Sequence, residues 1–458
     1  MLERLAGALN KILHPSMLAL VGRRDNPPAG CGDIVGAVTS SVSAGQSISA
    51  AELRALRLRG QLLTGPQAAS VAAAAVHLGG LQAQAAPPAQ LAVRARTSGL
   101  ATADVDRACG ASREVTRTWA MRGTLHILAT RDVRWMTGLF GPLVAGRGRR
   151  RRAQLGLDDG LCERALAALA VILAGSHPLT RAELVSRLAG EGVQIALRTQ
   201  QPPHLLGYAA GRGLICRGPD RPGRASPPDG PDGPGGRSRG GPGDPGGSGR
   251  VDGGGSGDPD AGAGAGGEPT YVLLDEWAPH APALGRPEAL AELARRYLGG
   301  YGPASREDFT AWSGLPAAEC TRALDLLAGD LVAVSAAGTR LFALAGHAVA
   351  EPADPPPRLL GQFDPYLLGY RDRGLVLDAG YAPRIQTGGG FVHSVVLIGG
   401  RVAGTWRLTR APGRARRARL TVEPFMALPA DGTDGLASEA ADIGRFLGLD
   451  VSLETAAT

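Results

Sequence analysis

The chain has 458 residues, room for two to four domains, and its 44% hydrophobic and 20% charged residues are typical of a globular protein. A net charge of +7 favours an anionic partner, although Lys11 is the only lysine and a uniform use of arginine is also typical of a GC-rich genome. No apolar run approaches the roughly 18 residues that cross a bilayer, and the N-terminus lacks a signal peptide's layout. We therefore expect a cytoplasmic protein without membrane contact.

Cysteine and lysine usage excludes two further kinds of site. The five cysteines are scattered and odd in number, so they predict neither a disulfide framework nor a zinc knuckle. A phosphate-binding Walker A loop needs a lysine after its glycine, and Lys11 does not lie in such a loop. We expect reduced thiols, no metal site and no cofactor.

Residues 1–48 form a leader without a regular pattern, which predicts a flexible tail or upstream sequence added by a wrong start codon. Ser49 is a favourable N-cap for a helix that starts at Ala50. Three more helices are predicted, from Pro66 to Gly79-Gly80, from Pro87-Pro88 through Arg96, and over residues 102–109. Two strands follow, T-R-T-W-A-M and T-L-H-I-L-A, joined at Arg122-Gly123. Helices followed by a β-hairpin are the order of a winged helix, here assigned to residues 49–157.

The same order recurs in residues 158–280, with helices predicted over 161–173, 181–188 and 203–211 and strands over 214–216 and 271–274. Thr180 caps the middle helix, with Glu183 at its third position. Between the strands, residues 217–268 are almost entirely Gly, Pro, Asp, Arg, Ser and Ala, a composition that does not bury a core. The flanking strands favour a disordered insertion in the tip of the second wing over an interdomain linker.

A third unit is predicted over residues 281–350, with helices over 287–298, 305–312 and 316–327 and a hairpin of strands 331–334 and 341–344. Ser305 caps its second helix, and Ala337-Gly338 forms the turn of the hairpin. The C-terminal part, residues 351–458, is expected to be rich in β-structure. Its strands are predicted over 395–398, 403–407 and 418–423, with a turn at Gly399-Gly400, and a last helix over 438–447.

Four segments in this order resemble one known family. They are G-L-Q-A-Q (80–84), T-W-A-M-R-G-T-L-H (118–126), F-D-P-Y-L-L-G-Y-R-D-R (363–373) and G-G-R-V-A-G-T-W-R (399–407). On these motifs the chain is identified as a member of the AlkZ/YcaQ family of winged-helix DNA glycosylases. The resemblance runs from about residue 50 to the C-terminus, apart from the Gly- and Pro-rich insertion.

The resemblance implies an α+β fold of three tandem winged-helix motifs in a C-shaped arrangement, with a β-rich C-terminal part. It also implies hydrolysis of the N-glycosidic bond of N7-alkylated purines, including bulky genotoxin adducts or interstrand crosslinks, in DNA repair or self-resistance. The family's catalytic signature is Gln-apolar-Gln in the AlkZ-like branch and Gln-apolar-Asp in the YcaQ-like branch. Gln82-Ala83-Gln84 matches the AlkZ-like form, so Gln82 and Gln84 are the expected catalytic residues.

The spacing of the two glutamines is informative in itself. Residues two apart diverge on a helix but share one face of an extended segment. Gly79-Gly80 before the pair and Pro87-Pro88 after it favour an extended backbone, which would let both amides point into one cleft.

Neutral amides also suit the implied chemistry. An N7-alkylated guanine already carries a positive charge and leaves without a strong general acid, whereas ordinary glycosidases need paired carboxylates because their leaving alkoxide must be protonated. Amide oxygens can position a water under C1′ and direct partial negative charge at the developing sugar cation. Because bifunctional glycosylases commonly form a Schiff base through an amine and Lys11 is the only lysine, we expect a monofunctional enzyme.

Other candidate residues carry two interpretations each. The densest basic run, expected to contact DNA phosphate or to lie on a solvated face, is Arg147, Arg149, Arg150, Arg151 and Arg152. His126 is a candidate DNA contact or a packed strand histidine, and Trp119 and Trp406 are expected in the core. Asp364 is expected to fix a turn with Tyr366 behind it, and Arg371 and Arg373 to meet phosphate or to pair with Asp372 or Asp378.

The expected partner is double-stranded DNA with an alkylated purine, bound by a monomer in the cytoplasm in association with the nucleoid. Two alternatives remain. A non-catalytic winged-helix regulator would prefer one undamaged sequence, typically as a dimer. A damage-binding protein without turnover would bind the lesion and release no base.

Overall fold

The computed structural model describes residues 45–221, 267–346, 355–388, 390–412 and 416–456. The predicted flexible leader over residues 1–44 and most of the predicted insertion, residues 222–266, lie outside these ranges. In the described ranges, no helix has both the length and the apolar character of a membrane span.

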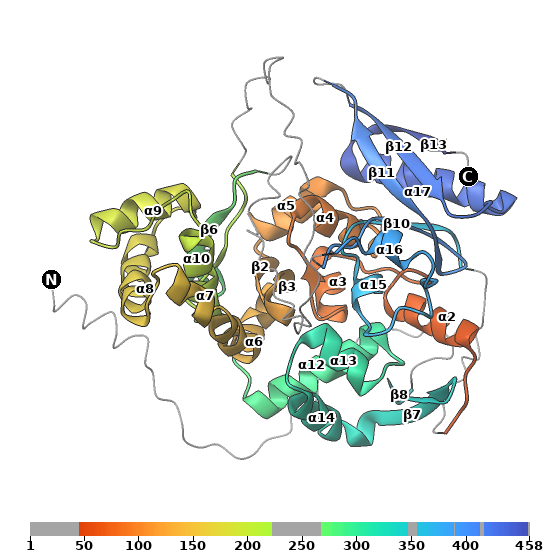
Figure 1. Cartoon of the computed structure of the whole chain (residues 1–458), viewed down its shortest axis with the longest axis horizontal. Helices are drawn as coiled ribbons and strands as arrows, with labels where there is room; N and C mark the ends of the chain where they lie inside the picture. Colours follow the sequence, from red (N-terminus) through yellow and green to blue (C-terminus); the bar gives the residue numbers. More distant parts are fainter. Residues whose placement is uncertain (1–44, 222–266, 347–354, 389, 413–415, 457–458) are drawn as a thin grey trace, which may run out of the picture.

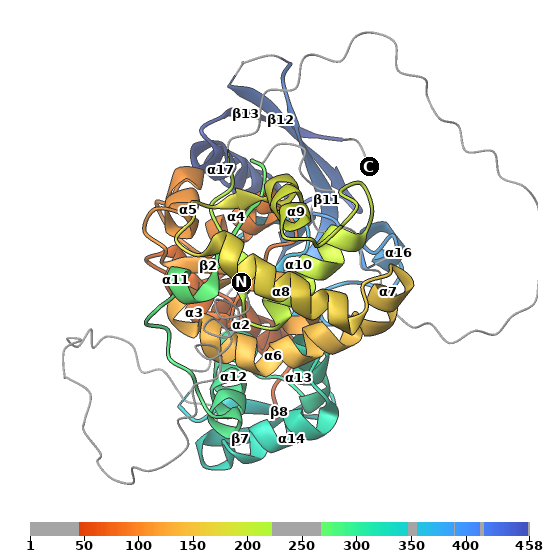
Figure 2. The same ribbon diagram turned by 90° about the vertical axis from the view of Figure 1, so that its left-hand side faces the viewer.

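The described residues form a mixture of helices and strands arranged around a central sheet. In Figure 1 the second unit lies on the left, the third unit below, and the C-terminal part at the upper right, with the first unit between them. The side view agrees, since the C-terminal strands lie at the top and the third unit's helices and hairpin at the bottom (Figure 2).

The first unit follows the predicted order of elements. Ser49 begins the first helix through a capping box with Glu52. The second helix begins at Val71 rather than near Pro66, because the Ser70 hydroxyl accepts a hydrogen bond from the Ala73 amide, 3.1 Å, and caps it there. The elements are α2 (Ala50–Gly60), α3 (Val71–His77), β1 (Leu81–Gln82), α4 (Ala86–Arg94), α5 (Thr102–Cys109), β2 (Val115–Trp119) and β3 (Leu125–Ala129), with a short 3-10 turn, Met121–Gly123, between the last two.

Two helices that the sequence did not predict lead to the second unit, α6 (Val133–Arg147) and α7 (Arg149–Gln154). The unit itself contains α8 (Asp159–Leu173), β4 (Leu179–Thr180), α9 (Arg181–Gly190), α10 (Gln201–Gly211), β5 (Ile215–Arg217), β6 (Thr270–Leu273) and α11 (Leu274–Trp277). The predicted capping box of Thr180 and Glu183 is present at α9. Strands β5 and β6 pair antiparallel, as expected for the flanks of the insertion, and the pairing extends to a bridge between Arg221 and Glu268.

The hairpins of the first two units form one sheet rather than two. Its strand order is β1-β3-β2-β5-β6-β4, and the units join where Arg117 of β2 pairs with Arg217 of β5. Arg117 also forms an ion pair with Asp220, 2.8 Å, next to this junction.

The third unit contains α12 (Arg286–Tyr301), α13 (Arg306–Ser313), α14 (Ala317–Asp325), β7 (Leu331–Ala336) and β8 (Thr339–Leu344), close to the predicted ranges. Its hairpin reaches the end of the predicted leader. The Ile48 amide donates to the Ser335 carbonyl, 2.8 Å, and the Ile48 side chain is buried. The boundary at residue 48 is therefore too late, because residues 45–48 pack on β7 through main-chain hydrogen bonds.

The C-terminal part is a five-stranded sheet of order β13-β12-β11-β10-β9, packed against one long helix. The elements are β9 (Arg358–Leu360), α15 (Pro365–Leu368), α16 (Ala382–Ile385), β10 (Val395–Ile398), β11 (Arg401–Arg410), β12 (Arg417–Pro424), α17 (Ala430–Leu447) and β13 (Asp450–Thr455). The last helix begins at Ala430, eight residues before the prediction. Its early turns contain Gly435, where a Cβ would lie 2.6 Å from the Pro357 ring, so close packing favours a residue of low helix propensity there.

One core joins the first and third units. It contains Leu78, Leu81 and Leu128 from the first unit together with Leu293 and Trp312 from the third. Trp119 and Trp406 are both buried, which confirms their prediction as core residues. Helices α12 and α13 therefore pack against the first unit's hairpin and hold it in place. The candidate site lies where β1 pairs with this hairpin.

Candidate active site

Gln82 lies on the extended segment that the sequence predicted. Gly79 and Gly80 end α3 with positive φ values of 64° and 114°, and a Cβ at Gly80 would lie 2.7 Å from the Leu128 side chain. The chain then pairs with β3, with Gln82 opposite His126. The Ala83 amide continues the pairing by donating to the Leu125 carbonyl, 2.7 Å.

The amide oxygen of Gln82 is held by an arginine. Arg122 Nη2 donates to Gln82 Oε1 at 2.7 Å, and Arg122 Nη1 donates to the Trp312 carbonyl. Arg122 lies in the connection between β2 and β3 with φ 57°, a left-handed conformation that few non-glycine residues adopt. Burial lowers the pKa of Arg122 to about 10, so the guanidinium stays charged at neutral pH.

Gln84 contacts the first residue of β3, next to the same connection. Its Oε1 accepts a hydrogen bond from the Leu125 amide, 3.0 Å, and thereby supplies β3 with an acceptor where the main-chain pairing ends. Both glutamine side chains are half-buried, and their partners, Arg122 and Leu125, lie three residues apart. The structure thus brings both predicted glutamines to one hairpin connection, and an amide oxygen retains a second lone pair for a further donor.

His126 is packed inside the sheet. It is 2% exposed on β3, between β1 and β2, and its Nδ1 lies 2.9 Å from the Thr124 carbonyl. Burial, together with the nearby Arg122 charge, lowers the pKa of His126 to about 3, so the imidazole is neutral at physiological pH. The packed interpretation therefore fits and a direct phosphate contact does not, because the ring neither reaches solvent nor carries charge.

The basic run divides into exposed and buried members. Arg152 is 4% exposed, donates to the Ala145 carbonyl and lies 4.1 Å from the Tyr208 ring centroid, so in this structure it packs inside the fold and not on the surface where a phosphate would bind. The exposed members are Arg147, Arg149, Arg150 and Arg151. Arg149 forms an exposed ion pair with Asp159, which leaves Arg150 as a member without a hydrogen bond or ion pair to the described residues.

The F-D-P-Y motif is structural. Asp364 caps α15 by accepting from the Tyr366 amide, 2.9 Å, and its carboxylate forms a fully buried ion pair with Arg96, 2.6 Å. Tyr366 packs behind it and donates to the Gly400 carbonyl, 2.9 Å. These contacts confirm Asp364 as a turn residue and link two of the four sequence motifs.

Arg371 and Arg373 do not form the ion pairs with Asp372 or Asp378 that the sequence left open, as judged within the described ranges. Arg373 Nε donates instead to the Leu367 carbonyl, 2.6 Å. Burial lowers the pKa of Arg373.

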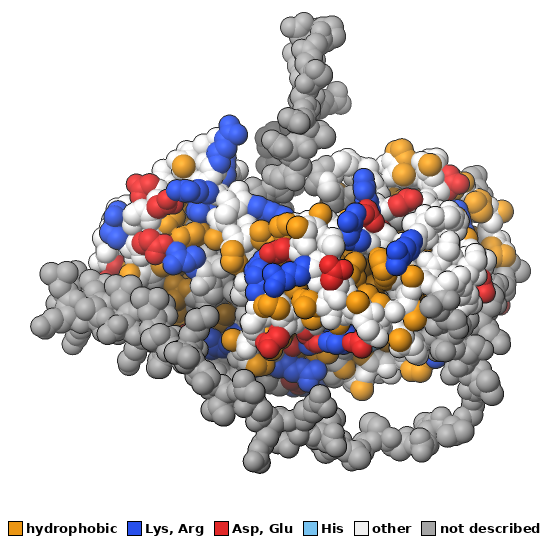
Figure 3. Space-filling view, turned by 90° about the horizontal axis from the view of Figure 1, so that it is seen from below, with side chains coloured by type: hydrophobic (Ala, Val, Ile, Leu, Met, Phe, Trp, Pro, Cys, Tyr) orange, Lys and Arg blue, Asp and Glu red, His pale blue; other side chains and the backbone are white. Residues whose placement is uncertain are grey.

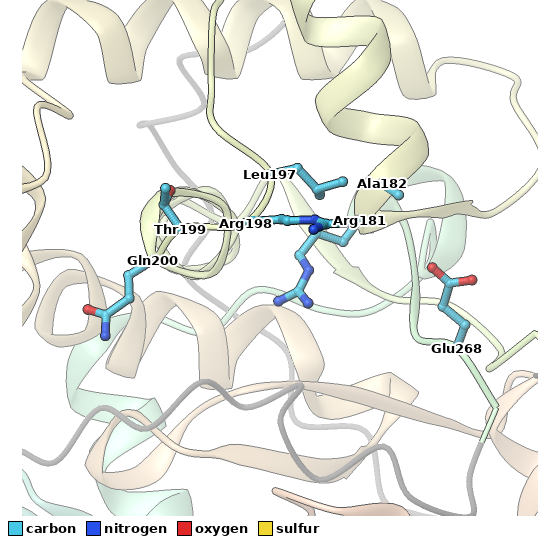
Figure 4. A pocket seen from close by; sticks show the side chains of 7 residues that line it. All are labelled: Arg181, Ala182, Leu197, Arg198, Thr199, Gln200 and Glu268. Atoms are coloured by element: carbon cyan, nitrogen blue, oxygen red, sulfur yellow. The ribbon is translucent and has the colours of Figure 1, made fainter. Parts of the chain in front are cut away.

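A pocket lies on the second unit, and neither Gln82 nor Gln84 lines it (Figure 4). It is lined by Arg181, Ala182, Leu197, Arg198, Thr199, Gln200 and Glu268. Arg151 of the basic run donates to Gln200 Oε1, 2.6 Å, so this pocket adjoins α7. The underside of the molecule, by contrast, shows arginine and acidic side chains interspersed (Figure 3).

In the part of the chain that the structure describes, no three His, Cys, Asp or Glu side chains are placed to hold a metal ion. The thiols of Cys109, Cys162, Cys216 and Cys320 are free. The one residue of this site that the sequence did not single out is Arg122, whose only signal was its place in the hairpin turn next to Gly123.

Comparisons with known proteins agree on one family. The family model described as "DNA glycosylase AlkZ-like" matches residues 75–230 and 256–446. The curated "Interstrand DNA cross-link repair glycosylase" of Streptomyces sahachiroi is 27% identical over 413 residues, which cover 86% of this chain and 95% of that protein. The solved structure of the Streptomyces sahachiroi DNA glycosylase AlkZ has a similar fold, with a TM-score of 0.68 and 24% identity, and covers 90% of this chain and 100% of that one.

Proposed function

The chain belongs to the AlkZ-like family of DNA glycosylases, and on that basis we propose that Gln82 and Gln84 hydrolyse the N-glycosidic bond of N7-alkylated purines in double-stranded DNA. The observation that carries the proposal is the pair of half-buried amides on one hairpin connection. The name of the 27% identical relative extends the proposal to purines that belong to interstrand crosslinks.

In the proposed reaction the two amides act on water and on the sugar. An alkylated purine carries its positive charge before the bond breaks, so the bond electrons pass to the base and no acid is needed to release it. As the sugar becomes cationic, the amide oxygens stabilise the charge and orient a water that adds to C1′ and releases its proton to solvent. His126 is neutral and buried beside Gln82, so it supports the position of β3 and takes no proton from the water.

The product is proposed to be an intact abasic site. Backbone cleavage through a Schiff base needs an amine near C1′. The only lysine of the chain, Lys11, lies outside the described residues, and the site itself contains amides and guanidinium groups.

The recurring order of helices and a hairpin supports an interpretation of the first three units as winged-helix motifs that curve around the duplex in a C-shape. In this interpretation the exposed arginines Arg147, Arg149, Arg150 and Arg151 supply salt-sensitive contacts to backbone phosphates. We propose a monomer that acts on chromosomal DNA in the nucleoid.

The test is base release from a duplex with one N7-methylguanine, followed by hot alkali. Wild type should give strand scission, and Gln82→Ala and Gln84→Ala should each slow it by about 100- to 1000-fold, the usual loss for one such donor or acceptor. Gln90→Ala removes an amide on α4 that donates to Asp106 on α5, and this variant should retain the wild-type rate.

Two outcomes contradict the proposal. If both glutamine variants cleave at the wild-type rate, these residues are not catalytic. If the wild type releases no base but enriches one sequence from random DNA, the chain is a regulator, and selective binding of damaged DNA without release identifies a damage-binding protein.

A further inference from the structure

Three arginines at or near the hairpin connection lack a neutralising carboxylate, and one of them, Arg122, contacts Gln82 directly. Arg122 donates to Gln82 Oε1, Arg147 donates to the Gly314 carbonyl at 2.8 Å, and Arg373 donates to the Leu367 carbonyl at 2.6 Å. None of the three forms an ion pair with any residue that the structure describes. Their partners are an amide oxygen and main-chain carbonyls, which orient a guanidinium without cancelling its charge.

Several segments hold these arginines near one another. Arg122 donates to the Trp312 carbonyl near the end of α13, and a Cβ at Gly314 would lie 3.1 Å from Arg122 Cα. Because Arg147 donates to the Gly314 carbonyl, both arginines are held at the C-terminal end of α13. Residues 367–373 lie on the other side, where the Tyr370 and Tyr301 rings are in contact and Tyr301 packs on Trp312 with centroids 5.4 Å apart. The charges of both Arg373 and Arg147 add to the lowering of the Arg122 pKa, which places all three within electrostatic reach.

Three buried or half-buried arginines elsewhere in the molecule are neutralised within the fold. Arg94 pairs with Glu439 at 2.9 Å, Arg96 with Asp364 at 2.6 Å, and Arg296 with Asp132. A buried charge ordinarily needs such a partner. Arg122 and Arg373 are half-buried and Arg147 is exposed at the edge, and no carboxylate among the described residues pairs with them, so they leave a cationic site that an external anion completes.

The proposed reaction also requires an anion next to these arginines. The alkylated base and the developing sugar cation are both positive, and three uncompensated guanidinium groups nearby would oppose them. A phosphodiester next to the reacting nucleotide removes this conflict, since it is an anion that every DNA substrate brings and that guanidinium binds in bidentate fashion.

We infer that Arg122, Arg147 and Arg373 form a binding site for one backbone phosphate of the damaged strand beside Gln82. The ligand is a phosphodiester monoanion, and Arg122 links it to the amide that faces the sugar. This inference rests on the proposed function, since it takes Gln82 as the residue that meets the sugar.

The experiment measures binding without catalysis. The full-length chain is titrated with a duplex that carries a tetrahydrofuran abasic analogue, and single phosphates near the analogue are replaced in turn by neutral methylphosphonate. At one position the replacement should weaken wild-type binding by about tenfold, the value of one charge-assisted contact. Arg147→Gln and Arg373→Gln should each weaken binding of the unmodified duplex by about tenfold. Each variant should bind the duplex with the methylphosphonate at that position as tightly as it binds the unmodified duplex, because the contact is already lost.

The matched control is Arg322→Gln, which removes the same charge from an exposed position on α14. The fold-loss in binding caused by Arg322→Gln should be the same on every methylphosphonate duplex as on the unmodified duplex, so the two losses multiply. If the effects of Arg147→Gln and Arg373→Gln also multiply at every position, or if both variants bind as wild type does, the phosphate site is refuted. Melting temperatures verify folding, and a variant that fails to fold is replaced by the Lys substitution.

Two further arms separate the remaining outcomes. Inorganic phosphate could protect the wild type but not the variants from thermal unfolding, while the variant and methylphosphonate losses multiply at every DNA position. In that case the site binds free phosphate and the inference for DNA is wrong. Failure of the proposed function is distinguishable, because a wild type that shows the coupling but releases no base refutes the glycosylase proposal and retains the phosphate site.

Discussion

Arg94 at the end of α4 and Arg96 just after it are buried, and Arg122 of the β2–β3 connection is half-buried, yet the two groups have opposite kinds of partner. Arg94 and Arg96 bind the carboxylates of Glu439 and Asp364, which join the first unit to the C-terminal part. Arg122 binds Gln82 and a main-chain carbonyl. A guanidinium neutralised by a carboxylate holds two parts of the fold together, whereas one held by neutral oxygens remains available to a substrate.

The largest effect is expected at the α4 junction. Asp364→Asn leaves the Arg96 charge buried without an anion, which should lower the free energy of unfolding by about 3–5 kcal/mol. Urea unfolding followed by circular dichroism measures it. A loss below 1 kcal/mol would show that the two classes of arginine do not differ as described.

A smaller effect on stability but a specific effect on activity is expected at the hairpin connection. Arg122→Lys retains the charge but lacks the fork that reaches both Gln82 and Trp312. Base release should slow by about tenfold at saturating substrate, the value of one hydrogen bond to a charged group. An unchanged rate in single-turnover kinetics would show that Gln82 needs no such support.

The exposed arginines of α7 should affect only binding. Arg150→Gln should weaken DNA binding a few-fold and reduce the slope of log affinity against log salt by about 1, because one phosphate contact is lost. Arg152→Gln, which changes a buried member of the same run, should leave the slope unchanged while lowering the melting temperature. Equal slopes for Arg150→Gln and wild type would remove Arg150 from the DNA-binding surface.

The smallest effect is expected on the pH dependence of the free energy of unfolding, and it is confined to acidic pH. The charge of Arg94 and its hydrogen bonds hold the pKa of Glu439 below its usual value despite burial. A lowered folded-state pKa stabilises the protein above the unfolded value, about 4.3, and this contribution is lost as pH falls through the folded value. Unfolding titrations between pH 3 and 7 should show a shallower acid decline in Glu439→Gln than in wild type, and parallel curves would contradict the assignment.

The extended segment that carries the candidate glutamines could be predicted from the sequence because its signals are local, whereas the glutamines themselves were assigned through the family resemblance. Gly79-Gly80 and the prolines at 87 and 88 indicated an extended backbone, and the structure has β1 and its continuation there. The hairpin turn at Arg122-Gly123 was likewise a local signal. The hydrogen bond from Arg122 to Gln82 spans 40 residues, and no local pattern indicates such a contact.

The elements that the sequence missed depend on tertiary packing. Helix α6 contains Gly141 and Pro142, which lower helix propensity, but a Cβ at Gly141 would collide with the Gly211 carbonyl of α10. The glycines are present because the two helices cross closely, which only the folded chain reveals. Strand β13 is missed for a similar reason, since it pairs parallel with β12 across the length of α17.

The shared sheet of the first two units has a mechanical consequence. Arg117 and Arg217 join β2 to β5, and Arg217 lies against the Trp119 and Tyr271 rings, so the strand that carries Gln82 and the strands of the second unit belong to one continuous sheet that serves as a shared template. A template of this kind does not close around its ligand like a hinge. We therefore expect the double helix to bend to fit it, and recognition to favour lesions that have already made the duplex easier to distort.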